Sequence, residues 1–285
     1  MKAAARLPAQ RWREGALEAQ ADELLAEEVP VALCYNGIAH AVMLASPLDL
    51  EDFALGFSLG ERIVRAARDI HDIEIEESCE GIAIEMRIAA GAMARLKEGR
   101  RARLGRTGCG LCGVESLGWF AQAAVHDTGA GAQPALRIDP AALHRAMAAL
   151  GTRQRLHQAT GAVHAAGWAA PDGELLCVRE DVGRHNALDK LVGALARSGM
   201  DAGAGFALVT SRASYEMVQK AARAGMPLLA AISAPTAMAV RLADQAGLTL
   251  AGFVREGRHV LYSHPQRVAA DLAATNREDC LAGID

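Results

Sequence analysis

The sequence predicts an α/β protein: a large domain with helices on both faces of a sheet, plus a smaller N-terminal α+β unit. Beyond residue 160, strand-like and helix-like segments alternate, and glycines stand at the junctions 199, 225 and 247. Such alternation is typical of a mainly parallel sheet covered on both faces. Residues 29–104 show short strand patterns around one clear helix. A chain of 285 residues, 51% of them hydrophobic, is long enough for both units.

The small unit is predicted over residues 29–104. Apolar runs at 31–35 and 38–45 flank Asn36-Gly37, a dipeptide that favours a tight hairpin turn. Asp49 offers a start signal for a helix over about 50–64, and alternating apolar and charged residues predict strands at 72–77 and 82–88. Residues 1–28 have helical spacing but few large apolar anchors, so we expect a loosely attached arm.

The large domain is predicted over residues 119–285. A helical stretch at 119–126 and a glycine-rich break at 127–134 precede a helix that begins at Asp139-Pro140 and can end at Gly151. Strands are expected near 163–170, 174–179, 206–210, 227–232, 248–254 and 259–263, and helices near 184–198, 214–224 and 235–246. Right-handed crossovers would place the loops after the strands along one edge of the sheet.

Residues 105–118 form a predicted flexible loop that carries Cys109 and Cys112. The stretch GRTGCGLCG has four glycines in nine residues, and arginines stand at 100, 101, 103 and 106. Positive charge favours the thiolate, which is the reactive form of cysteine. The pair could be half of a zinc site, a redox or sulfur-handling pair, or incidental. A zinc site needs two more ligands, and no second Cys-x-x-Cys exists, so the spacing favours redox or sulfur chemistry.

The segment 179–190 (REDVGRHNALDK) is the densest polar stretch, at a strand-to-helix junction. Gly183 lets the backbone approach a ligand, and the free amides at the helix start can hold an anion, with Arg184 and Lys190 adding charge. His185 and Asn186 add neutral donors. The alternative is a capped helix with solvated ion pairs.

A second candidate lies between the last two strands. The stretch Phe253, Val254, Arg255, Glu256, Gly257 and Arg258 places two arginines around one glycine. Paired guanidinium groups suit the oxygens of a phosphate. A plain hairpin with solvated arginines fits the spacing nearly as well.

Two further junctions carry polar residues. Residues 210–214 (TSRAS) follow a buried-looking strand, where Ser211 or Ser214 can simply cap a helix. His164 follows a run of small residues. A zinc deaminase would need His-x-Glu there, but Ala165 and Ala166 follow the histidine, which argues against deamination.

Composition excludes several function classes. The net charge of -4 provides no global attraction to nucleic acid or anionic lipid. The longest apolar run, 226–240, is interrupted by Pro227 and Pro235 and is too short to cross a bilayer. The N-terminus lacks a secretory apolar core, and six cysteines are too few for a disulfide scaffold. We therefore expect a cytoplasmic protein without nucleic acid or membrane partners.

Over residues 28–265 the sequence resembles the formate dehydrogenase accessory sulfurtransferase family, FdhD. The resemblance is carried by ordered segments along the chain: Asn36-Gly37, DFALGFSLGE, GCGLCG, TGAVHAA, EDVGRHNALDK, TSRASYEMVQKAA, ISAPTAMAV and AGLTLAGFVREGR. It implies a cytidine-deaminase-like three-layer domain without zinc. It also implies a homodimer.

The resemblance further implies a task. Sulfur would come from a cysteine desulfurase as a persulfide on Cys109, assisted by Cys112. It would pass to the bis(molybdopterin guanine dinucleotide) molybdenum cofactor, a bound substrate destined for formate dehydrogenase. The family's cofactor segment falls on 253–258, and the helix start after Gly183 is a second plausible holder of its phosphates. Two alternatives remain: a nucleoside or base deaminase relative, and a non-catalytic chaperone that only holds the cofactor.

Overall fold

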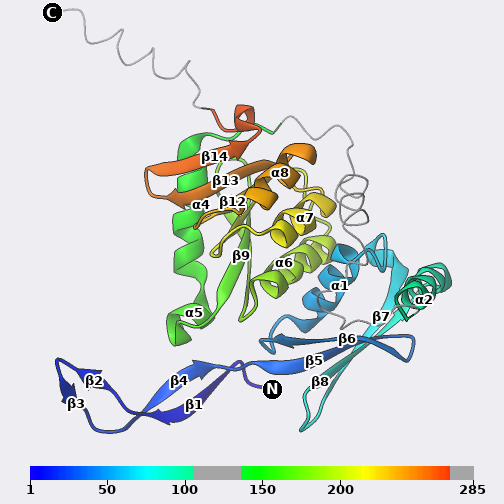
Figure 1. The fold of residues 1–285 in the computed structure, drawn as a ribbon, viewed down its shortest axis with the longest axis horizontal. Helices are drawn as coiled ribbons and strands as arrows, with labels where there is room; N and C mark the ends of the chain where they lie inside the picture. Colours follow the sequence, from blue (N-terminus) through cyan, green and yellow to red (C-terminus); the bar gives the residue numbers. More distant parts are fainter. Residues whose placement is uncertain (105–135, 270–285) are drawn as a thin grey trace, which may run out of the picture.

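Two sheets organise the chain in the computed structural model, which describes residues 1–104 and 136–269 (Figure 1). A six-stranded sheet has the order β10-β9-β11-β12-β13-β14, and a four-stranded sheet has the order β6-β5-β8-β7. The larger sheet comprises β9 (His164–Ala169), β10 (Leu175–Asp181), β11 (Phe206–Val209), β12 (Leu228–Ala231), β13 (Thr249–Arg255) and β14 (Arg258–Ser263). The prediction of a large α/β domain preceded by a smaller unit is confirmed.

The larger sheet is mixed, so the prediction of a mainly parallel sheet is wrong. Only the pairs β11–β12 and β12–β13 are parallel, whereas β9 runs antiparallel to both β10 and β11, and β14 runs antiparallel to β13. The reason is the length of two connections. Residues 170–174 and 256–257 are too short for a crossover and can only turn the chain back as hairpins.

Helices cover both faces of this sheet. On one face lie α6 (Arg184–Ser198), α7 (Tyr215–Arg223) and α8 (Ala237–Gln245), whose apolar side chains share a core with Trp168, Val209 and Leu229. On the other face α4 (Pro140–Arg153) packs against Phe206 and Leu208. These are alternating residues of the strands, as expected where both faces are buried. The three-layer prediction is confirmed.

The small unit packs α1 (Leu50–Gly60) on a sheet of β5 (Val29–Tyr35), β6 (Ile38–Ala45), β7 (Ile70–Glu77) and β8 (Ile82–Ile88), and α2 (Ala90–Leu104) follows. The predicted hairpin turn is present, with positive φ at Asn36 (47°) and Gly37 (77°). Helix α1 ends four residues before the predicted Val64, because the chain turns through a left-handed conformation at Arg62 (φ 55°).

Helices α1 and α6 join the two units at backbone contact. A Cβ atom added to Gly193 would lie 1.9 Å from the carbonyl oxygen of Asp52, and one added to Gly56 would lie 1.7 Å from that of Asp189. Only glycine leaves room for so close an approach.

Three boundaries differ from the sequence-based expectation. The first 26 residues form a β-ribbon of β1 (Ala4–Ala9), β2 (Trp12–Arg13), β3 (Ala16–Leu17) and β4 (Ala21–Ala26), not a helical arm, and it projects from the molecule (Figure 1). Helix α4 continues past Gly151 to Arg153, where α5 (Arg155–Thr160) takes over and ends at Gly161 (φ 69°). The predicted cysteine loop 105–118 and helical stretch 119–126 lie outside the described residues.

None of the helices in the described part of the chain is long and apolar enough to cross a membrane.

Candidate functional site

Four predicted polar junctions meet at one edge of the six-stranded sheet, which we call the carboxyl edge. It comprises residues 164, 182–186, 210–214, 232–236 and 253–258. Backbone hydrogen bonds tie its loops together: Thr210 N donates to Ala165 O at 3.0 Å, and Phe253 N donates to Ser233 O at 3.2 Å. The expectation that loops after the strands gather along one edge therefore holds for β10, β11, β12 and β13, whereas the loop after the antiparallel strand β9 lies at the opposite edge.

At one end of this edge, helix α6 begins without a side-chain cap. Gly183 is the N-cap residue, and the helix starts at Arg184. Nearby, Ser214 likewise begins α7 without a side-chain cap. The first amides of a helix have no partner within the helix and carry partial positive charge, so two uncapped starts side by side favour an anion.

His185 links these two helix starts. Its Nε2 lies 2.8 Å from a carboxylate oxygen of Glu216 and 3.4 Å from Ser214 Oγ. Burial lowers the pKa of His185, and the charge of Glu216 opposes that effect. The imidazole is therefore favoured in its neutral form, as a hydrogen-bonding group that fixes α6 against α7.

A cavity of about 450 Å³ opens at the same edge beside His164. Thr210, His157 and Gln154 contribute to its wall. Burial lowers the pKa of His164, and the positive charge of Arg184 lowers it further. Gln154 is 5% exposed, and its Oε1 has no hydrogen-bond partner within the described part of the chain. A buried polar atom without a partner is costly, so this cavity suits a ligand with a donor.

At the other end, β13 and β14 form a hairpin whose tip exposes charge. Arg255 pairs with Arg258 across the strands, and Glu256-Gly257 makes the turn, with φ 70° at the glycine. Neither arginine forms an ion pair within residues 1–104 and 136–269. Phe253 is 43% exposed and adopts a left-handed φ of 52°, whereas the Val254 side chain is fully buried. The hairpin thus presents two guanidinium groups and one aromatic ring.

The two ends of the carboxyl edge are far apart. Four strand spacings separate β10 from β13, which corresponds to about 19 Å at roughly 4.8 Å per spacing. A single phosphate cannot reach both. An elongated ligand with several anionic groups can.

Two side chains that were predicted to bind a ligand, those of Lys190 and Asn186, are buried and bonded to other protein groups. Lys190 is fully buried, where its Nζ lies 2.7 Å from an Asp181 carboxylate oxygen and donates to Ser46 O at 2.9 Å. The Asn186 side chain is 3% exposed and donates to Leu44 O and to Asp181. Only the backbone of Asn186 remains available at the helix start.

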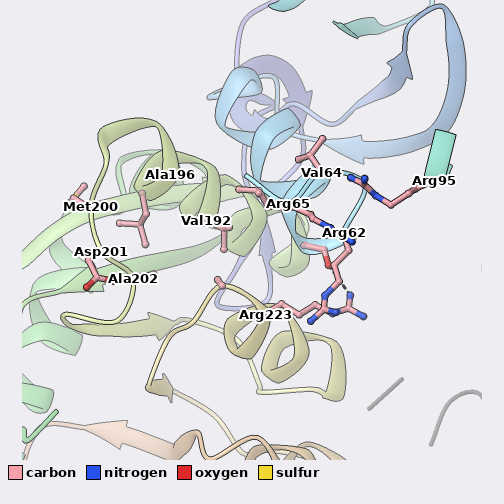
Figure 2. A pocket seen from close by; sticks show the side chains of 14 residues that line it. Arg62, Val64, Arg65, Arg95, Val192, Ala196, Met200, Asp201, Ala202 and Arg223 are labelled. Carbon is pink, nitrogen blue, oxygen red and sulfur yellow. Dashed lines mark hydrogen bonds between the residues drawn. The ribbon is translucent and has the colours of Figure 1, made fainter. Parts of the chain in front are cut away.

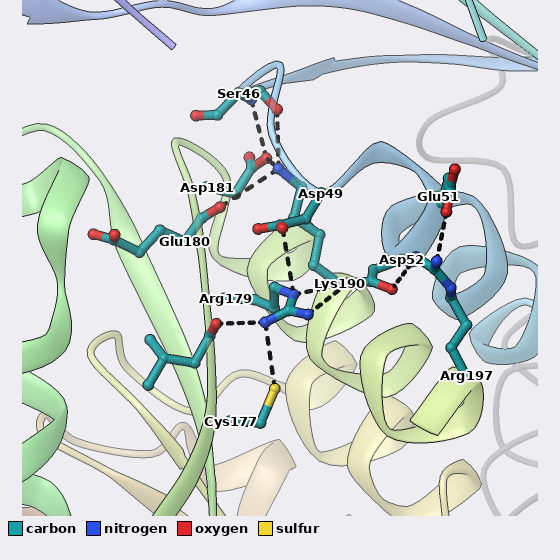
Figure 3. A network of polar contacts seen from close by, with 11 residues as sticks. Ser46, Asp49, Glu51, Asp52, Cys177, Arg179, Glu180, Asp181, Lys190 and Arg197 are labelled. Carbon is teal, nitrogen blue, oxygen red and sulfur yellow. Dashed lines mark hydrogen bonds and ion pairs between the residues drawn. The ribbon is translucent and has the colours of Figure 1, made fainter. Parts of the chain in front are cut away.

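Three of the six charged residues in segment 179–190 instead connect the two units: Arg179 binds the small unit through Asp52, and Asp181 and Lys190 bind it through Ser46 (Figure 3). Arg179 and Arg197 each approach the Asp52 carboxylate at 2.8 Å, and this carboxylate is nearly buried. On the far side of α6, Asp189 and Lys220 pair at 2.9 Å. Removing one member of a buried pair leaves an unpaired charge and costs roughly 3–5 kcal/mol. The sequence-based prediction did not include this role in connecting the two units. The one signal for it in the sequence is Asp52, an acidic residue within the apolar pattern of α1.

Two of the described cysteines, Cys34 and Cys177, are not activated thiols. Burial raises the pKa of Cys177, and burial together with Glu85 raises that of Cys34. Cys79 is exposed. Cys109 and Cys112 lie outside the described residues. No cluster of three potential metal ligands occurs in the part of the chain that the structure describes.

Comparisons with known proteins identify close relatives. The model of the FdhD/NarQ family matches residues 26–269. A sulfur carrier protein FdhD of Cupriavidus necator is 59% identical over 263 residues, which cover 90% of this chain and 88% of the relative. The protein of the same name from Bordetella parapertussis is 56% identical over 265 residues, covering 91% of this chain and 93% of the relative.

A solved structure has the same fold. A protein from Desulfotalea psychrophila, described as a formate dehydrogenase accessory protein, superposes with a TM-score of 0.70. The match covers 94% of this chain and 100% of the other, at 23% sequence identity. This likeness supports the arrangement of layers and strands.

Proposed function

The chain belongs to the FdhD/NarQ family, and from that premise we propose that it is a sulfurtransferase required for formate dehydrogenase activity. It takes sulfur from a cysteine desulfurase and passes it to the bis(molybdopterin guanine dinucleotide) molybdenum cofactor before the cofactor enters formate dehydrogenase. We place this work in the cytoplasm and assign it to a homodimer. The relatives' name, sulfur carrier protein, supports the sulfur-handling part of the proposal.

The loading step uses Cys109 as the nucleophile. Its thiolate attacks the outer sulfur of the desulfurase persulfide, forms a new S–S bond, and releases the desulfurase cysteine as a thiolate. One sulfur atom is transferred from the desulfurase cysteine to Cys109, and no external oxidant or reductant is needed. Arginines at 100, 101, 103 and 106 favour the thiolate, and Cys112 assists as the neighbouring thiol.

The observation that carries the cofactor part is the spread of anion-binding groups along the carboxyl edge. The substrate is an elongated polyanion with guanosine diphosphate at each end. Arg255 and Arg258 hold phosphate at the hairpin, and Phe253 offers an aromatic face to a guanine. The amides after Gly183 and the guanidinium of Arg184 hold phosphate at the other end.

A cofactor-binding chaperone is the alternative that fits the same edge. It would need the arginines but not the thiol. A base deaminase is disfavoured, because Ala165 and Ala166 follow His164, so the His-x-Glu signature of the zinc deaminases is absent.

Complementation separates these functions. In cells that lack their own carrier, we expect Cys109→Ala and the double variant Arg255→Gln/Arg258→Gln each to abolish formate dehydrogenase activity. Cys79→Ser and Arg241→Gln, which change an exposed thiol and an exposed arginine elsewhere, should preserve it. Full activity with Cys109→Ala would establish the chaperone and refute sulfur transfer.

A further inference from the structure

A second cavity lies between the two units, at the opposite end of α6 from the carboxyl edge (Figure 2). Its volume is about 820 Å³. Val192, Ala196 and Met200 line it near the end of α6, which begins at residue 184. Eight residues of helix separate Arg184 from Val192, about 12 Å at 1.5 Å per residue, so this cavity is distinct from the proposed cofactor site.

Four arginines from three parts of the chain converge on this cavity. Arg62 and Arg65 come from the turn after α1, Arg95 comes from α2, and Arg223 comes from the end of α7. An adjoining hollow of about 320 Å³ shares Arg65 and Arg95 and adds Arg68. The whole forms an arginine-lined cleft, which is the name used for it below.

The charge of the cleft remains positive after its neighbours are counted. Two carboxylates lie on its walls, Asp201 in the larger cavity and Asp69 in the adjoining hollow, and α1, α6 and α7 all end at the larger cavity. A helix C-terminus carries roughly half a negative charge. The five guanidinium groups of the two hollows exceed two carboxylates and three such ends.

Two of these arginines are available to a ligand. Arg223 donates to Gly60 O at 2.7 Å, so its guanidinium is partly engaged. The exposed guanidinium groups of Arg65 and Arg95 form no ion pair within the described chain. Arg62 is held in a left-handed conformation (φ 55°) that is unfavourable for a residue with a side chain. Such strain is often retained where a side chain must be aimed at a particular point.

The rest of the wall is apolar. Leu59, Val64, Val192 and Leu195 line it together with Ala196 and Met200. An inorganic anion would leave this surface unused. A cavity of 300–1,000 Å³ with an apolar wall and a few convergent charged groups is typical of a small organic ligand, and guanidinium groups favour phosphate.

From this combination we propose that the arginine-lined cleft is a second binding site, for an organic phosphate of nucleotide size. Its phosphate groups contact Arg65 and Arg95, and its apolar or aromatic body lies against Val192 and Ala196. This site does not rest on the proposed sulfurtransferase function.

Calorimetry of the full chain at low ionic strength tests the site, with GDP and pyrophosphate as probes. Arg65→Gln/Arg95→Gln should weaken GDP binding in the cleft at least tenfold, whereas Arg6→Gln/Arg13→Gln, which removes the same charge from the N-terminal ribbon, should not. Ala196→Glu places a negative charge in the cleft and should weaken GDP binding similarly. Ala196→Gln adds a side chain of nearly the same size without the charge and should not. Pyrophosphate should bind at least threefold more weakly than GDP.

The carboxyl edge is silenced separately with Arg255→Gln/Arg258→Gln, which should leave binding in the cleft unchanged. The cleft variants are then compared in this silenced protein. If GDP still binds it with unchanged affinity after both Arg65→Gln/Arg95→Gln and Ala196→Glu, the proposal is overturned. The absence of any GDP binding to the Arg255→Gln/Arg258→Gln protein would also overturn it. Equal affinity for pyrophosphate and GDP would refute the claim that the organic body of the ligand contacts the apolar wall. If Arg255→Gln/Arg258→Gln removes no GDP binding from the full chain while the cleft variants do, the result counts against the proposed function and supports the cleft assignment.

Discussion

Arg258 is the residue that most directly separates binding from folding. It is exposed at the hairpin tip, so Arg258→Ala should change the free energy of unfolding by less than about 1 kcal/mol. Losing a charge-assisted contact to phosphate costs roughly 1.5–3 kcal/mol, so GDP binding at the carboxyl edge should weaken about ten- to a hundredfold. Calorimetry and a thermal melt measure both quantities. Normal GDP affinity, or a large drop in Tm, would make Arg258 a solvated or structural residue.

His164 gives the molecule a pH-dependent stability. Burial and Arg184 lower its pKa in the folded protein below that of the unfolded chain, near 6.5. As pH falls, the unfolded chain therefore binds the proton first, and stability is lost through the folded pKa. We expect the free energy of unfolding to decrease from pH 7.5 to 5.5, and less steeply in His164→Gln. Urea titrations at both pH values measure the slopes; equal slopes would show that His164 titrates normally when folded.

Individual residues also show where sequence reasoning succeeds and where it stops. Asn36-Gly37 and Gly257 were predictable because a tight turn depends on neighbours in the sequence. Lys190 and Asn186 were assigned to a ligand because their polarity is visible in the sequence, while their partners Ser46 and Leu44 lie over a hundred positions away. Long-range burial of a polar group leaves no local pattern that spacing could detect.

At the scale of helices and strands, the α1–α6 contact controls how the two units fit. Because the Gly193 Cβ position is occupied by backbone of Asp52, Gly193→Ala must push the helices apart. We expect a loss of about 3 kcal/mol, the upper end of the usual range for overpacking. Gly151→Ala is the matched control: it lies in α4 with open space around it and should gain roughly 0.5–1 kcal/mol. Denaturant unfolding measures both, and equal effects would contradict the close packing.

The positions of the strands were predictable because their signals are local in the sequence. All six strands of the larger sheet, and the helices α6, α7 and α8 that connect them, were predicted from apolar periodicity and terminal glycines. Strand direction was not, because a five-residue link at 170–174 reads as a loop whether it closes a hairpin or leads elsewhere. The first 26 residues were misread because a ribbon with little burial has no strong apolar alternation.

For the whole molecule, the groups proposed to bind anions at the carboxyl edge lie at one end of α6, and the arginine-lined cleft between the two units lies near its other end. The small unit is fixed to the larger domain by the paired glycines and by the buried pairs around Asp52 and Asp181. In the proposed function, the reactive thiol and the cofactor site are separate groups on this frame. We propose that Cys109 carries the sulfur.

Mass spectrometry of the full-length protein after incubation with a cysteine desulfurase and cysteine tests that claim most directly. We predict one added sulfur atom, mapped by peptide analysis to Cys109, and the same product in Arg258→Ala, because loading does not use the carboxyl edge. Cys109→Ala should gain none. Added sulfur on Cys34, Cys79 or Cys177 in place of Cys109, or no added sulfur on the folded protein, would contradict the assignment.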